Sequence, residues 1–493
     1  MSSHPHPEFS PSPEPTSAKW WVMLGVGLGV LMFTLDTSIV NIALPTLVKV
    51  FQTTFATIQW VVLSYLLVVT ALVLGAARLG DMIGKKRLYL GGLIVFTISS
   101  LLCGLSPGVG WLIGFRALQG MGAVMISALG AALVTEAFPS SERGRALGII
   151  GAVVSLGIAL GPTVGGLLIG LSDWRMIFLV NVPIGIFASF VVARSVPSSH
   201  YQATRQKFDW FGLVVMTIAL TAFALGMTHG QDAGFTNPIT LGLLAIAIVG
   251  LVIFLWQESR ITSPLVDLSL FHNPQFSLSL LTGVLVFIVI AGTIFIIPFF
   301  LELVLHYPTP HVGLLLAVSP VLGGIVAPFS GNLSDRFGTR IISLIGLGLM
   351  VIGCLSISTF NSQMTDIDYI VRVAPFGIGL GMFQSPNNSA ILGSVPPERL
   401  GIASGLLSLT RTLGQTTGVP LLGAIFAGIV LMQSSTTNVT NAPPDSLVFG
   451  VQITFKIAAA VLAIATSIMF ILWRSQPRKT RSRPVEPISK DRE

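Results

Sequence analysis

The stretch GIIGAVVSLGIALGPTVGGLLIG, residues 148–170, decides how the chain is built. It is apolar throughout and, at ~1.5 Å per residue, long enough to cross the ~30 Å hydrocarbon layer of a membrane. Gly157, Gly161 and Gly165 recur at every fourth residue and therefore share one helical face. A face without side chains lets another helix approach closely. Pro162 removes a backbone hydrogen bond and predicts a bend.

The composition extends this interpretation to the whole chain. Of its 493 residues 52% are hydrophobic and only 10% are charged, and the mean hydropathy is +0.84. Such a balance excludes an ordinary soluble protein and indicates a polytopic α-helical membrane protein. Fourteen apolar runs are expected to span the bilayer, at residues 20–44, 57–80, 88–107, 111–136, 144–170, 174–196, 209–229, 238–257, 276–305, 311–333, 341–360, 368–394, 401–431 and 450–473.

The basic residues predict the orientation of these spans. If both termini are cytoplasmic, most of the 27 Lys and Arg residues lie on the cytoplasmic side, including those of the basic tail. The net charge of +7 therefore suits an anionic membrane leaflet and does not indicate nucleic-acid binding. Cys103 and Cys354 lie inside apolar runs far apart in the sequence, so we expect packed thiols and no disulfide or metal framework.

The second half of the chain repeats the first. Leu79–Lys85 parallels Leu333–Thr339, and the LGPTVGGLLIG sequence from Leu160 parallels LGQTTGVPLLG from Leu413. Nearly the same number of residues separates Pro45 from Pro298 and Arg116 from Arg372. Two related six-helix bundles with a pathway between them are therefore predicted.

The repeat divides the chain into domains. The two spans between the bundles are an insertion, and we expect them to lie away from the pathway. The predicted divisions are a disordered cytoplasmic tail, the N-terminal bundle, the insertion with its linkers, the C-terminal bundle and a basic cytoplasmic tail, at residues 1–18, 19–196, 197–260, 261–473 and 474–493.

Several motifs resemble one known family. LDTSIVNIALP from Leu35, ARLGDMIGKK from Ala77 with its copy GNLSDRFGTR from Gly331, RALQGMGA from Arg116, WRMIFLVNVPIG from Trp174 and FDWFG from Phe208 all match its pattern. With the glycine-rich fifth span, they resemble the fourteen-span drug/proton antiporters of the major facilitator superfamily. Ala77 and Met82 depart from the usual glycine and arginine of the loop signature, which weakens the case for a switching role of that loop.

Asp36 is the residue that we expect to carry the proton. It lies ~24 Å along the first span from the cytoplasmic side. An ionised carboxylate among lipid tails is costly, so Asp36 should face a cavity, where it could gain a proton from one side and release it to the other. The alternative is a structural acid held by hydrogen bonds from Asn41 or Thr37.

Arg116 lies at a similar depth in the fourth span and could face Asp36, where it would stabilise the carboxylate. The alternative for Arg116 is a packing role, with the guanidinium donating to backbone carbonyls. The resemblance implies a coupling role for both residues.

The substrate pathway is assigned to a second group of polar residues within the spans. Arg411 is about ten residues into its span and must be partnered there. Glu302 matches Lys49 in the repeat and is expected to be a solvated residue at the outer rim. The assigned residues are Asn41, Gln119, Arg411 and Glu302.

The resemblance also implies two mechanical devices. One is the antiporter motif, which we expect to bring the two halves into close contact, formed by Gly148, Gly157, Gly161, Pro162, Gly165 and Gly166. The other is a pair of cytoplasmic gating loops that latch the bundles closed, formed by Asp81, Gly84, Lys85, Asp335, Arg336 and Gly338.

Together these features predict a proton-coupled exporter of amphipathic or cationic organic compounds that works by alternating access. We expect a monomer in the plasma membrane of a bacterium. We also expect it to work without a cofactor or a metal. A dedicated metabolite or lipid exporter, or a facilitator-type importer, remains an alternative from the same fold. A membrane enzyme is disfavoured, because the sequence has no nucleotide-binding loop, metal-ligand cluster or nucleophile–base spacing.

Overall fold

The computed structural model describes residues 16–139, 142–197, 209–261, 265–266, 268–396, 399–434, 436 and 438–474. This part of the chain is helical. Thirteen described segments are long and apolar enough to cross a membrane. The fourteenth predicted span is α14, which is long enough but more polar than the others. The predicted tails lie largely outside the described residues.

The N-terminal half contains six membrane spans, the sixth of which is divided between two helices. Their bounds are α1 Thr16–Phe51, α2 Phe55–Ile83, α3 Lys85–Gly104, α4 Val109–Ala137, α5 Arg143–Leu171, α6 Met176–Leu179 and α7 Asn181–Ser195. The insertion follows as α8 Trp210–Ala233 and α9 Pro238–Glu258.

The C-terminal half begins with the short 3-10 helix η1 Leu268–His272. Its remaining elements are α10 Pro274–Leu303, α11 Thr309–Leu316, α12 Val318–Phe337, α13 Thr339–Ile357, α14 Asp366–Leu392, α15 Leu400–Gln433, η3 Val439–Asn441 and α16 Pro444–Arg474. The predicted span 311–333 is divided between α11 and α12, which meet at Ala317.

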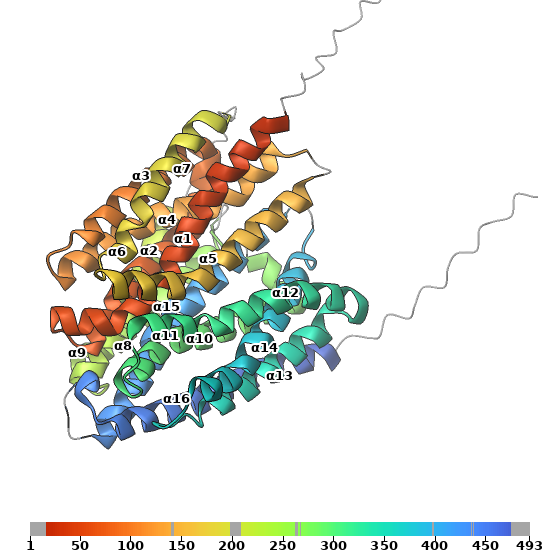
Figure 1. Ribbon diagram of the computed structural model, residues 1–493. Helices are drawn as coiled ribbons and strands as arrows, with labels where there is room; N and C mark the ends of the chain where they lie inside the picture. The colour runs from red at the N-terminus through yellow and green to blue at the C-terminus, as the bar shows by residue number, and fades with distance from the viewer. Residues whose placement is uncertain are drawn as a thin grey trace, which may run out of the picture.

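Two ends of the molecule are distinguished below. The terminal end is where α1 begins and α16 ends, and the distal end is where α1 ends and α2 begins. In Figure 1 the N-terminal half, red to yellow, lies beside the C-terminal half, green to blue, and α5 and α12 diverge toward the terminal end.

The two halves are closed against each other at the distal end. Phe55 at the start of α2 packs against Phe295 and Phe299 of α10 and Phe426 of α15, with ring centroids 4.9–5.7 Å apart. Near the middle of the helices, the hydroxyls of Thr70 and Thr416 hydrogen bond across the interface at 2.9 Å. These apolar and uncharged contacts seal the distal side.

The terminal end of α5 is open by contrast. A Cβ added to Gly148 or Gly151 would meet no atom within 4 Å. Further along the helix, Leu156 and Leu160 are 51% and 38% exposed. The halves are therefore closed distally and separated along the terminal part of α5.

Burial separates the central helices from the peripheral ones. In the most apolar window of α10, 78% of residues are buried, against 11% in α9. Helix α9 therefore lies at the rim, packed on α8. Helix α8 also contacts α2 of one half and α15 of the other, so this inserted helix lies beside the interface.

Candidate functional site: a buried ion pair and its surroundings

Asp36 and Arg116 are in direct contact inside the N-terminal half. Arg116 Nη1 donates to Asp36 Oδ2 at 2.6 Å, and the two residues are 1% and 0% exposed. The packing of α1 on α4 brings them together. Breaking such a buried pair by removing one partner typically costs ~3–5 kcal/mol, because the other charge is left uncompensated.

Amide side chains complete the shell around Asp36. Gln119 Nε2 donates to Asp36 Oδ1 at 2.9 Å, and Asn181 Nδ2 donates to the same oxygen at 3.1 Å. Gln119 also donates to the Ser100 hydroxyl at 2.7 Å. Oδ2 is therefore held by Arg116, and Oδ1 is held by uncharged amides from α4 and α7, which orient the acid without adding charge.

The guanidinium of Arg116 is held on three further sides. Its Nε donates to the Val61 carbonyl at 3.0 Å, and its Nη1 donates to Gln119 Oε1 at 2.6 Å. The Tyr65 ring lies 4.3 Å from its central carbon, a cation–π contact. Arg116 therefore makes both the predicted contact with Asp36 and a backbone contact of the kind named as its alternative.

The sequence analysis missed part of this network. Asn181 and Ser100 were not singled out, although Asn181 is a polar residue inside the apolar motif WRMIFLVNVPIG. Gln119, which was assigned to the substrate pathway, is fully buried and bonds within the network. Asn41 Nδ2 donates to the Thr37 carbonyl at 3.0 Å, and the described contacts do not link it to Asp36.

Arg411 lies in α15 beside the interface between the halves. Its side chain is partly exposed, and among the described residues it makes no hydrogen bond or ion pair. Its electrostatic neighbour is Tyr65 of α2, which belongs to the opposite half. The expectation that Arg411 is partnered within the protein is therefore wrong for the described part of the chain.

Glu302 lies at the distal end of α10, where a solvated side chain was expected. That expectation is wrong, because Glu302 is only 7% exposed. The Thr309 hydroxyl of α11 donates to its Oε1 at 3.3 Å, and Lys49 Nζ of α1 lies 3.8 Å from its Oε2. The turn between α10 and α11 covers the carboxylate, and the pair with Lys49 joins the two halves.

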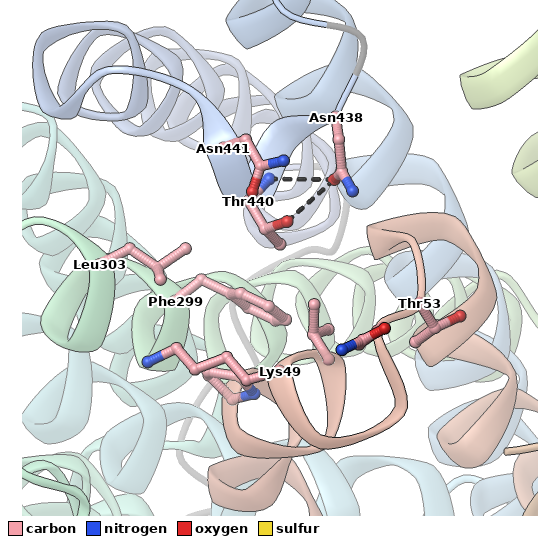
Figure 2. Close-up of a pocket in the computed structure, with 10 residues that line it drawn as sticks. Lys49, Thr53, Phe299, Leu303, Asn438, Thr440 and Asn441 are labelled. Atoms are coloured by element: carbon pink, nitrogen blue, oxygen red, sulfur yellow. Dashed lines mark hydrogen bonds between the residues drawn. The ribbon is translucent and has the colours of Figure 1, made fainter. Parts of the chain in front are cut away.

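A pocket of about 380 Å³ opens beside Lys49 at the distal end. Figure 2 shows Lys49 and Thr53 of the N-terminal half on one side, with Phe299 and Leu303 of α10 and the η3 segment around them. Asn438 Oδ1 accepts hydrogen bonds from the Thr440 backbone and hydroxyl. These bonds fix the local conformation of the η3 loop, whose residues line the pocket.

The glycine stripe of α5 contacts α1 of its own half. A Cβ on Gly161 would lie 2.5 Å from Ser38 Cβ, and one on Gly165 would lie 2.6 Å from Ile39 Cγ1. Gly157 packs equally closely on Thr34. The expectation that this stripe joins the two halves is therefore wrong, because the stripe faces α1.

Pro162 has a specific part in this packing. Proline lacks the N–H that would bond to the Ile158 carbonyl one turn earlier. The Ser38 hydroxyl of α1 donates to that carbonyl at 2.9 Å. The backbone acceptor that Pro162 leaves free thus serves the α1–α5 contact.

A second face of α5 meets the C-terminal half. A Cβ on Gly166 would lie 2.7 Å from the Thr309 carbonyl, and one on Gly170 would clash with Pro310. The Pro162 carbonyl likewise lies against Gly313 of α11. Gly170 is therefore part of the contact between the halves.

The predicted gating loops are sharp turns at the terminal end. Gly84 has φ 99° and Gly338 has φ 90°, a backbone conformation that favours glycine. Lys85 forms an ion pair with Glu136 of its own half, and Asp335 and Arg336 are exposed. The side chain of Asp81 lies outside the described residues, so the latch stays a prediction.

Comparison with known proteins identifies the family. The model described as Major Facilitator Superfamily matches residues 26–419. The chain belongs to the Major Facilitator Superfamily. It is therefore a multi-pass membrane transporter and not an enzyme.

Named relatives of this Major Facilitator Superfamily chain are transporters. It is 36% identical to the riboflavin transporter RibZ of Clostridioides difficile, over 83% of this chain and 88% of that protein. It is 35% identical to the multidrug resistance protein Stp of Mycobacterium tuberculosis, over 82% and 75% of the two chains.

The fold is shared with solved structures. A bacterial homologue of the human lysosomal transporter Spinster aligns over 93% of this chain and 97% of its own, with a TM-score of 0.67 and 16% identity. At that identity the likeness concerns the Major Facilitator Superfamily fold alone.

Proposed function

We propose that this transporter exports small amphipathic organic compounds in exchange for protons. The observation that supports this most strongly is the Asp36–Arg116 pair, buried in a conformation whose distal end is closed. The terminal end would be cytoplasmic, as the distribution of basic residues favours. The chain would work as a monomer in the plasma membrane, driven by the proton gradient without a cofactor.

The coupling step follows from the charges of this pair. With the terminal side open, Asp36 is ionised and held by Arg116, which stabilises the carboxylate after its proton has left toward the cytoplasm. When the distal side opens, a proton from outside neutralises Asp36 and weakens its bond to Arg116. The loss of that bond favours release of the substrate outside and return to the starting state.

The glycine contacts of α5 provide the surfaces for this movement. The stripe of Gly157, Gly161 and Gly165 fixes α5 to α1, so the N-terminal half moves as one body. The face of Gly166 and Gly170 on α11 is the contact that must separate when the distal side opens. This division suits rocking of two rigid bundles about a central site.

A dedicated exporter of one metabolite is the second candidate. The relative named a riboflavin transporter supports it, because a single planar organic compound would then be the natural substrate. Import is less well supported, since the fifth-span motif resembles that of exporters. The two export candidates share the proposed proton coupling and differ only in breadth of substrate.

Transport into everted membrane vesicles tests the proposal. Vesicles would be given an acidic lumen and offered cationic, neutral and anionic dyes together with riboflavin. We expect gradient-driven accumulation that a protonophore abolishes, with substrate-induced loss of protons from the lumen. Equal accumulation with and without the gradient would contradict proton coupling, and accumulation of riboflavin alone would favour the dedicated exporter.

A further inference from the structure

Arg411 is the charged group in the central region that the proposed coupling does not use. It lies about 17 Å along α15 from Leu400, on the terminal side of the contact between Thr70 and Thr416. The distal closure therefore lies beyond it. A compound that approaches from the terminal opening would meet Arg411 before it meets that closure.

The charge of Arg411 is not balanced by the described residues around it. Asp36, the acid of the central region, is already neutralised by Arg116 at 2.6 Å. Glu302 lies at the distal end, where Thr309 and Lys49 contact it. Placing an arginine within a membrane span is costly unless it faces water or an anion, so such residues mark substrate or ion pathways.

The surroundings of Arg411 are aromatic. Tyr65 of the opposite half lies within electrostatic range of Arg411, and its ring packs against the Arg116 guanidinium. Gly414 lies one turn further along α15 and packs against Phe287 of α10. A Cβ added to Gly414 would lie 2.6 Å from the Phe287 Cβ. Phe287 is itself partly exposed. A partly exposed guanidinium, one turn along α15 from the contact with the partly exposed Phe287, suits a ligand with a planar apolar body and a negative group.

We infer that Arg411 binds the negatively charged group of the exported compound, so that amphipathic aromatic anions are preferred over cations. This inference rests on the proposed export function and sharpens its substrate class. It replaces the cationic preference that the family resemblance implies. A carboxylate or sulfonate would supply the counter-ion that the described residues do not provide at Arg411, and it would accept two hydrogen bonds from the planar fork of the guanidinium.

A pair of matched probes tests the inference by binding alone. Anilinonaphthalene sulfonate and phenylnaphthylamine share one aromatic body and differ in the sulfonate. Saturable fluorescence binding to purified full-length protein would be measured without a proton gradient. We expect the sulfonate to bind about tenfold or more tightly than the neutral probe, as for hydrogen bonds to charged groups.

Substitutions of Arg411 then test whether this residue causes the preference for the sulfonate probe. Arg411→Gln should remove the preference by weakening the sulfonate only, Arg411→Lys should keep part of it, and Arg411→Glu should reverse it toward a cationic dye. Lys456→Gln, which removes an exposed charge of α16, is the matched control and should change nothing. Size-exclusion profiles identify any variant that fails to fold, in which case Arg411→Lys still tests the charge requirement.

The possible outcomes separate this inference from the proposed function. Equal or weaker binding of the sulfonate by the wild type, or an equal loss of both probes in Arg411→Gln, would overturn the anion site. Loss of proton coupling in Arg411→Gln with unchanged probe preference would do so as well. Suppose that the sulfonate binds more tightly than the neutral probe but the gradient drives no transport. That result would overturn proton-coupled export and leave the anion site supported.

Discussion

The two halves of this transporter share a repeat but differ at the positions that matter for charge. In the first half Asp36 and Arg116 form a buried ion pair. At the offset of 253 residues that separates Pro45 from Pro298 in the same span, the position matching Asp36 is Val289, which is buried and apolar. Arg372, the match of Arg116, donates only to the Thr359 carbonyl at 3.4 Å, in an exposed contact.

This difference suits a division of the two tasks of the proposed proton-coupled export. The first half concentrates a titratable acid, its cation and three amide or hydroxyl partners in one buried network. The second half provides an apolar central helix, α10, and Arg411, to which the described residues offer no hydrogen bond or ion pair. We therefore assign proton handling to the first half and selection of substrate charge to the second.

The largest effect should come from removing the acid. Asp36→Asn keeps the side-chain shape but cannot release a proton, so gradient-driven export should fall to background while the protein still inserts. The exposed Asp445→Asn in the second half is the matched control and should transport normally. Uptake into everted vesicles measures both, and near-normal export by Asp36→Asn would end the assignment of coupling to Asp36.

Removing the two matched arginines should give unequal losses. Arg116→Ala leaves the buried Asp36 uncompensated, a cost of ~3–5 kcal/mol that should impair folding stability and coupling. Arg372→Ala should cost much less, about 1 kcal/mol or below, because the contact that the described residues show for Arg372 is one long hydrogen bond to the Thr359 carbonyl. Thermal unfolding and vesicle uptake of both variants test this, with Arg116→Lys expected to retain part of the coupling. Similar losses at Arg116 and Arg372 would remove the asymmetry between the halves.

The two faces of α5 should respond differently to one added methyl. Gly166→Ala would push against the Thr309 carbonyl and favour opening of the distal side, whereas Gly161→Ala would strain the α1 contact inside one half. Each overpacking should cost ~1–3 kcal/mol, which shifts an equilibrium about 5- to 150-fold.

Thiol labelling of a Thr53→Cys reporter at the distal pocket separates these outcomes, because both native cysteines are buried. Labelling should accelerate in Gly166→Ala but not in Gly161→Ala, which should instead lower the unfolding temperature. Gly151→Ala is the control on the same helix, since its Cβ meets open space. Faster labelling in all three would point to general loosening of α5.

The smallest effect should come from the ion pair across the distal seam. Lys49 is 61% exposed on its side chain and lies 3.8 Å from Glu302, so the pair should contribute only ~0–1 kcal/mol. Lys49→Gln should therefore change the export rate less than about fivefold, and the difference should vanish at high salt. A complete loss of export would show that Lys49 takes part in transport itself.

Residue types and depth predicted much of this arrangement. Apolar runs located the spans, because the bilayer fixes their length, and equal depth suggested that Asp36 and Arg116 meet. The inward face of each helix depends on the packing angles between helices. The sequence does not reveal this face when a span is apolar all round, because such a span has no polar side to mark the outside. For that reason Asn181 and Ser100 were missed, although they are polar residues in apolar spans.

The glycine stripe illustrates the same limit. Its spacing correctly indicated a close helix contact, but spacing does not name the partner, which is α1 and not the other half. Burial of Glu302 was also not predictable, because it depends on the turn that carries Thr309 back over α10.

The inserted helix α8 has a consequence for the route by which compounds reach the central region. Trp60 Nε1 of α2 donates to the Thr228 hydroxyl of α8, and Gln59 bonds to Gln231. Toward the terminal end, Leu213 and Met216 of α8 join the same apolar cluster as Leu406 of α15. Helix α8 therefore covers the lateral seam between α2 and α15, and α9 adds a second layer outside α8.

The opposite seam has no such cover from the insertion. There α5 faces α11 and α12, and Leu156 and Ile325 are 51% and 58% exposed. A compound dissolved in the lipid leaflet would thus meet the two layers of α8 and α9 on one side of the protein. On the other side it would meet α5 and α12 directly. In the described part of the chain, the two extra spans therefore cover only one of the two lateral seams between the halves.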